Sequence, residues 1–85
     1  MSDADLKKRY RWQCRRGLKE VDVVLNDYLD LYFDQDDAAR QALFGRLLEE
    51  QDADLFEWFT ERSVPEDAEL AGHVRLMLER LRRPA

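Results

Sequence analysis

Side chains that favour β-strands are almost missing from this sequence. It has five Val, one Thr and no Ile, against 13 Leu. β-branched residues fit strands and lose side-chain freedom in helices, whereas Leu, Ala, Arg, Gln and Glu are good helix formers. Only three Gly and two Pro interrupt the chain. The sequence therefore predicts an all-α fold.

Apolar residues recur every three or four positions in five segments, which predicts five helices. The expected ranges are 3–15, 19–33, 37–50, 53–62 and 66–82. The second segment has the clearest apolar stripe, made of Val21, Val24, Leu25, Tyr28, Leu29 and Tyr32. Because the connecting turns are short, we expect a compact five-helix bundle that forms one domain over residues 1–85.

A few residues mark where these helices begin, end or meet. Gly17 follows two arginines, as is typical of a helix C-terminus, because cations suit the helix dipole there and glycine adopts the left-handed cap. Asp36 or Asp37 is placed to cap the third helix, and Asp52 the fourth. Gly45 stands inside the third helix, which predicts the close approach of a neighbouring helix.

The composition offers little for catalysis. With one Cys and one His, an intramolecular disulfide and a multi-cysteine zinc site are excluded, and no metal site is expected. Cys14 lies on an apolar line and is predicted to be a buried hydrophobe, although nearby arginines could instead lower the pKa of its thiol. His73 is offset from its apolar row and is predicted to be exposed, whereas Trp58 is predicted to belong to the core. No catalytic motif is present, so we do not expect an enzyme.

The sequence also bears on the compartment. No apolar run approaches the roughly 20 residues that cross a bilayer, so membrane insertion is not expected. The acidic start, Met-Ser-Asp-Ala-Asp, does not resemble a signal peptide. Together with the single cysteine, this makes the cytoplasm the expected location.

Charge is unevenly distributed along the chain. Residues 1–20 hold seven Lys or Arg and three acidic residues, whereas residues 21–60 hold two Arg and 11 acidic residues. The early basic residues are Lys7, Lys8, Arg9, Arg11, Arg15, Arg16 and Lys19. They predict either a solvated helix that faces the acidic ones or a docking face for an acidic or phosphate-bearing partner. Interleaved aromatic residues can indicate RNA binding, but the net charge of −5 argues against nucleic acid as a partner.

The corner between the first two expected helices is the most informative stretch. It reads Arg16-Gly17-Leu-Lys-Glu20. Gly17 allows a tight turn and the close approach of a partner, and Arg16 can make a forked contact to a carboxylate or phosphate. The plainer alternative is that Arg16 and Glu20 pair across the corner and cap it.

This corner and two further stretches resemble the SdhE family of flavinylation factors, which mature succinate dehydrogenase. The family signature, Arg-Gly-x-x-Glu, is matched by Arg16, Gly17 and Glu20. The other matching stretches lie within residues 47–58 and 65–76, in the family's order and spacing. Together the three stretches are far more specific than the signature alone.

The resemblance implies a five-helix bundle that is an assembly factor and not an enzyme. Members of the family bind the flavoprotein subunit of succinate dehydrogenase, and often that of fumarate reductase, and promote covalent attachment of FAD to it. The flavin is thus attached to the partner, and no stably bound cofactor is expected here. The resemblance assigns the partner-binding face to Arg16, Gly17 and Glu20, with Trp12, Arg15 and Asp22 as flanking candidates. An antitoxin-like or other interaction module with a different partner is the alternative.

Overall fold

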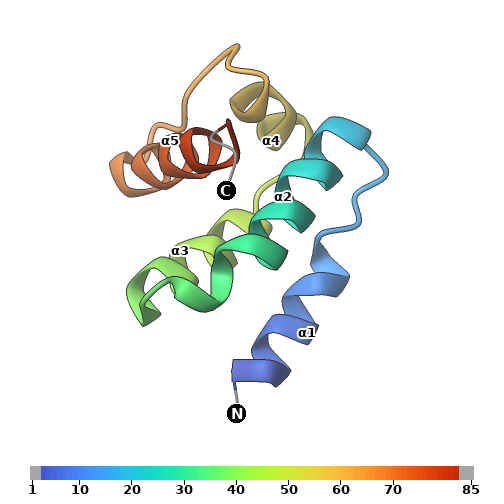
Figure 1. Ribbon diagram of the computed structural model, residues 1–85. Coiled ribbons are helices and arrows are strands. Elements are labelled where there is room, and N and C mark those ends of the chain that lie inside the picture. The colour runs from blue at the N-terminus through green and yellow to red at the C-terminus, as the bar shows by residue number, and fades with distance from the viewer. Residues whose placement is uncertain (1–2, 83–85) are drawn as a thin grey trace.

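The computed structural model describes residues 3–82, which form five α-helices joined by short turns (Figure 1). The helices are α1 (Asp3–Gln13), α2 (Lys19–Leu31), α3 (Ala38–Leu48), α4 (Asp52–Phe59) and α5 (Ala68–Arg82). A short 3-10 turn, η1 (Phe33–Gln35), follows α2. The predicted all-α bundle is confirmed, since residues 3–82 contain no strand.

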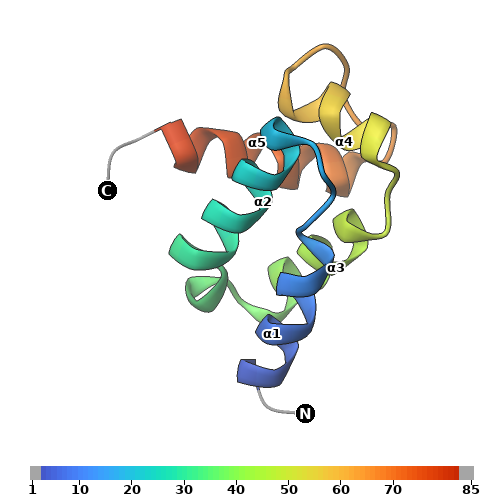
Figure 2. The same ribbon diagram turned by 90° about the vertical axis from the view of Figure 1, so that its right-hand side faces the viewer.

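The helices are arranged around α2. This helix packs against α1 on one side and against α4 and α5 on others, and η1 folds back onto its end. The third helix packs against α5 and α1 (Figures 1 and 2). The turn between α1 and α2 therefore lies beside the start of α4, which places the Arg16-Gly17 corner near the α3–α4 connection.

The core is formed by the predicted apolar stripes. On α2 it contains Val21, Leu25, Tyr28 and Leu29, which confirms the stripe expected there. Aromatic rings fill its centre, where Phe44 stacks on Tyr28 with ring centroids 5.8 Å apart. Such packed ring pairs add to the stability that their burial alone provides.

The ends and meeting points of the helices agree with most of the local signals. The Asp37 side chain accepts a hydrogen bond of 2.9 Å from the Arg40 backbone N–H, so Asp37 caps α3 as predicted. A Cβ atom at Gly45 would lie only 2.8 Å from Cζ of Tyr10, which confirms the close approach of α1. The prediction that Asp52 caps α4 is wrong by one residue, because Gln51 occupies the capping position.

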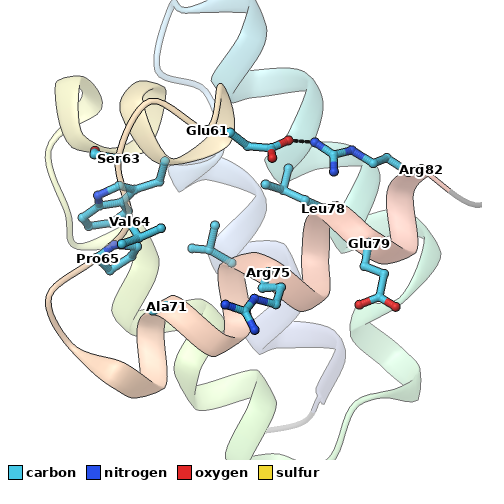
Figure 3. Close-up of a pocket in the computed structure, with 11 residues that line it drawn as sticks. Glu61, Ser63, Val64, Pro65, Ala71, Arg75, Leu78, Glu79 and Arg82 are labelled. Atoms are coloured by element: carbon cyan, nitrogen blue, oxygen red, sulfur yellow. Dashed lines mark ion pairs between the residues drawn. The ribbon is translucent and has the colours of Figure 1, made fainter.

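Two predictions about side-chain burial need correction. His73 is 1% exposed rather than exposed, because it lies three residues after Leu70 and four before Met77, on the same inward face of α5. Trp58 is only partly buried at the edge of the core. It lines a groove between the α4–α5 connection and α5, where Glu61 and Arg82 form an ion pair (Figure 3).

Candidate functional site

The turn between α1 and α2 is held by side chains of α2. The Asp22 carboxylate accepts hydrogen bonds from the backbone N–H groups of Arg16, at 2.8 Å, and Gly17, at 3.2 Å. Asn26 donates to the Cys14 carbonyl at 3.3 Å. Gly17 has a φ of +83°, the left-handed conformation predicted for a glycine at this helix end. Hydrogen bonds to side chains of α2 therefore fix the backbone of the corner.

The Arg16 side chain points inward and is hydrogen-bonded within the protein. Its Nε donates to the Gln13 carbonyl at 2.7 Å, and one terminal nitrogen donates to the Glu50 carbonyl at 3.1 Å and to Asp52 Oδ1 at 2.8 Å. The other terminal nitrogen donates to the Leu48 carbonyl at the end of α3. These contacts use four of the five N–H groups of the guanidinium. The side chain, 14% exposed, thus satisfies carbonyls that the end of a helix leaves unpaired.

Glu20 differs from Arg16 in that it is exposed and has no partner. No hydrogen bond or ion pair joins its side chain to any of residues 3–82. The plainer alternative, an Arg16–Glu20 pair across the corner, is therefore wrong, because Asp52 takes the place of Glu20. A carboxylate in water beside a rigid turn is free to meet a cation on another molecule.

Each of the other predicted site residues either holds the turn, as Arg16 does, or is exposed to solvent, as Glu20 is. Asp22 is a structural residue of the turn, whereas Trp12 and Arg15 are exposed beside it, and Trp12 is 73% exposed. Gly17 is exposed, and a Cβ atom placed on it would meet no atom within 4 Å. Exposed tryptophans such as Trp12 are enriched among the residues that dominate binding at protein interfaces.

A second polar cluster, which we call the Asp36 cluster, was not predicted from the sequence. It consists of Tyr28, Asp36 and Arg80. The Tyr28 hydroxyl donates to Asp36 at 2.6 Å, and Arg80 donates to Asp36 at 2.7 Å and to the Tyr28 oxygen at 2.9 Å. The Asp36 side chain is 2% exposed, and burial, reinforced by the hydrogen bond to Asp36, raises the pKa of Tyr28. Because each member is paired within the cluster, it is a structural link.

Neither Cys14 nor His73 is suited to chemistry at neutral pH. Cys14 is completely buried, and burial raises the pKa of its thiol to about 11, outweighing Arg11 and Arg16. The predicted buried hydrophobe is confirmed, and the alternative of a lowered thiol pKa is wrong. Burial lowers the pKa of His73 to about 4, so its ring is neutral, and neither ring nitrogen has a hydrogen-bond partner.

The described part of the chain contains neither a metal-binding cluster nor a membrane-spanning helix. Among these residues there is no group of three or more His, Cys, Asp or Glu that could hold a metal ion. None of the five helices has the length and apolar character needed to cross a bilayer. The candidate functional site is the corner around Arg16, Gly17 and Glu20, where an internally fixed turn lies beside an exposed, unpaired carboxylate.

Known proteins resemble this chain over most of its length. The family described as flavinator of succinate dehydrogenase matches residues 8–82. The FAD assembly factor SdhE of Pseudomonas aeruginosa is 43% identical over 81 residues, which cover 95% of this chain and 96% of that protein. The protein of the same name from Idiomarina loihiensis is 42% identical over 76 residues, covering 89% of this chain and 84% of the relative. The one from Yersinia pestis is 36% identical over 78 residues, covering 92% and 89%.

Proposed function

This chain belongs to the family of flavinators of succinate dehydrogenase, and we propose that it is an FAD assembly factor. It binds the flavoprotein subunit of succinate dehydrogenase and promotes the covalent attachment of FAD to that subunit. The proposal is supported by relatives named FAD assembly factor SdhE, of which the match covers 96% and 84%. It places the protein in the cytoplasm, in keeping with a single, buried and protonated thiol.

The observation that carries the proposal is that some motif residues hold the corner together while another remains exposed. Arg16 and Asp22 hold the turn from inside, whereas Glu20 faces solvent without a partner. Burying an unpaired carboxylate in an interface is unfavourable. The client, by which we mean the flavoprotein subunit, must therefore present a cation or hydrogen-bond donors to Glu20. The corner is therefore prepared for a partner with a complementary charge.

The mechanism that fits this geometry is positioning. Covalent attachment needs a histidine nucleophile on the client and stabilisation of the negative charge that develops on the flavin ring. A rigid helical body that holds the parts of the client in the reactive geometry can lower the barrier by several kcal/mol. In this role the protein supplies a docking surface, Arg16 acts as a positioning residue, and the flavin stays with the client.

The test is a flavinylation assay with purified components. The apo-flavoprotein subunit is mixed with FAD and limiting amounts of this protein, and covalent flavin is read as fluorescence of the denatured subunit. We expect Glu20→Gln to reduce covalent flavin clearly while the helical circular-dichroism spectrum is unchanged. Glu66→Gln is the matched control, since Glu66 is exposed on the α4–α5 connection, away from the corner.

Two outcomes would contradict the proposal. The first is covalent flavin at equal levels with wild-type and Glu20→Gln protein, which would remove Glu20 from the functional face. The second is a pull-down in which identification by mass finds a toxin or another protein in place of a flavoprotein subunit, as an antitoxin-like module would give. Repeating the assay with the fumarate reductase flavoprotein subunit tests the second expected client.

A further inference from the structure

Part of the basic segment on α1 is neutralised within the bundle. Lys7 pairs with Asp34 at 2.9 Å, and Arg11 forms an ion pair with Asp30 and donates to Asn26 at 3.0 Å. These contacts join α1 to α2 side by side and in opposite directions. The prediction of a basic helix that faces acidic residues therefore holds for this side of α1.

The outer side of α1, the adjoining turn and the first residue of α2 carry basic side chains that remain unpaired. Lys8, Arg15 and Lys19 are exposed, and none of their side chains forms a hydrogen bond or ion pair with the described residues. Lys8 and Trp12 are four residues apart, and each lies roughly 160° round the helix from the core-packed Tyr10. We call Lys8, Trp12, Arg15 and Lys19 the basic ridge.

An edge of opposite charge lies next to the basic ridge on α2. Asn26 faces α1, because it accepts a hydrogen bond from Arg11. Asp27 and Glu20 are turned from Asn26 by roughly 100° and 120° in the same sense, and both are exposed. The acidic edge, defined by Glu20 and Asp27, thus lies about a third of a turn round α2 from the face that meets α1. The surface around the corner is positive on the α1 side and negative on the other.

We propose that the basic ridge docks on an acidic surface of the flavoprotein subunit, while the acidic edge meets a basic one. This inference rests on the proposed function and adds the chemistry of the partner's surface. Two charged patches of opposite sign define one orientation of the client, because rotation about the contact would bring like charges together. Trp12 lies within the ridge as the apolar anchor of the contact.

The charge pattern favours a protein partner over a lipid surface or RNA. Both of those are uniformly anionic, so they would attract the basic ridge but repel the adjacent acidic edge. The whole chain carries a net charge of −5, which adds to that repulsion. A folded protein can instead present both signs within one interface.

Association kinetics with the apo-flavoprotein subunit test the inference. In Lys8→Glu/Arg15→Glu protein we expect the association rate constant to fall about tenfold or more at low salt, with a much smaller change in dissociation. The difference should shrink above about 0.1 M salt, where the screening length is about 10 Å. Arg40→Glu/Arg75→Glu is the matched control, with the same change of charge at exposed positions on α3 and α5.

A milder variant guards against unfolding of the charge-reversed protein. Lys8→Gln/Arg15→Gln removes the charges without reversing them, and we expect an intermediate reduction in the association rate constant. Circular dichroism of all variants should match that of the wild type. A salt-independent loss shared with the Arg40→Glu/Arg75→Glu control would overturn the inference, since it would reflect net charge and not the ridge.

The remaining outcomes separate this inference from the proposed function. If wild-type protein does not bind the flavoprotein subunit, the proposed function fails. If it binds, and Glu20→Gln weakens binding but the ridge variant associates normally, only the inference is overturned. The inference also fails if phosphatidylglycerol vesicles or an RNA oligonucleotide bind the wild type through the ridge while client association does not depend on it.

Discussion

The Arg16 corner and the Asp36 cluster both use an arginine to join segments distant in sequence, but they differ in what is left exposed. Arg16 donates to three carbonyls and to Asp52, and the motif carboxylate of Glu20 remains in water. In the Asp36 cluster, both carboxylate oxygens are paired and the side chain is buried. The comparison suggests that mutations in the cluster act on stability, whereas those on the outer corner act on binding.

Breaking the Asp36 cluster should have the largest effect on stability. Arg80→Met leaves the Asp36 carboxylate buried with only the Tyr28 hydroxyl as a partner. Removing one partner of a buried pair is typically destabilising by 3–5 kcal/mol. Because the Arg80 side chain is 31% exposed, we expect the lower end, about 3 kcal/mol, in urea denaturation.

The control for this prediction is an arginine whose ion pair is exposed. Arg46 pairs with Asp67 at 2.6 Å on the surface, so Arg46→Met should change the free energy of unfolding far less than Arg80→Met does. Equal losses for Arg80→Met and Arg46→Met would mean that burial does not distinguish the two pairs. The proposed contrast between the buried Asp36 cluster and exposed ion pairs would then fail.

Arg16→Met should have the next largest effect on the free energy of unfolding, because it removes the hydrogen bonds that join the corner to the end of α3 and the start of α4. We expect a loss of about 2 kcal/mol, since the freed Asp52 and carbonyls can partly turn to water. Arg16→Lys keeps the charge but not the fork, so about half of that loss should remain. Covalent flavin on the client should fall in both variants, even at a temperature where each is folded. Full stability and full flavinylation with Arg16→Lys would show that the forked contact is not needed.

His73→Leu should change stability in the opposite direction. His73 packs edge-on against Tyr28, with ring centroids 5.6 Å apart, and both of its buried nitrogens lack partners. A buried polar group without hydrogen bonds is unfavourable by about 1–3 kcal/mol, so an apolar residue of similar size should stabilise the fold by about 1–2 kcal/mol at pH 7. A destabilised His73→Leu protein would show that the imidazole is satisfied in solution.

The same substitution should change how stability depends on pH. The pKa of His73 is lowered to about 4 in the folded protein, against an ordinary value of 6.5. The unfolded chain therefore binds more protons between these values, so the stability of the wild type falls as the pH drops from about 6.5 towards 4. The total loss is about 3 kcal/mol, and His73→Leu should lack it. Denaturation curves at pH 7 and pH 5 should show the gap between the two proteins widening at pH 5.

How far the sequence predicts this molecule depends on the range of each interaction. The apolar stripe of α2, the Asp37 cap and the left-handed Gly17 follow from patterns within a few residues, and all three are found. Three of the four partners of the Arg16 side chain lie more than 30 residues away, and two of these three are backbone carbonyls, which a sequence pattern does not indicate. The Asp36–Arg80 pair spans 44 positions and was hidden among other acidic residues. Local sequence patterns therefore predict the helices and the turn at Gly17. Which residue of the motif is exposed to a partner depends on tertiary contacts, which such patterns do not indicate.

Gly17 offers the finest test of that division, because its smallest substitutions should rank differently for stability and for binding. Its φ of +83° disfavours residues with a Cβ, but asparagine tolerates this region better than alanine, and no atom lies within 4 Å of the added Cβ. We expect Gly17→Ala to lower the free energy of unfolding by about 1 kcal/mol and Gly17→Asn by less. Asparagine, however, projects the larger side chain into the space where the client would dock, so it should weaken client binding more than alanine does. If binding followed stability, with Gly17→Ala the weaker binder, the bare backbone at Gly17 would serve the fold of the corner and not its contact with the flavoprotein.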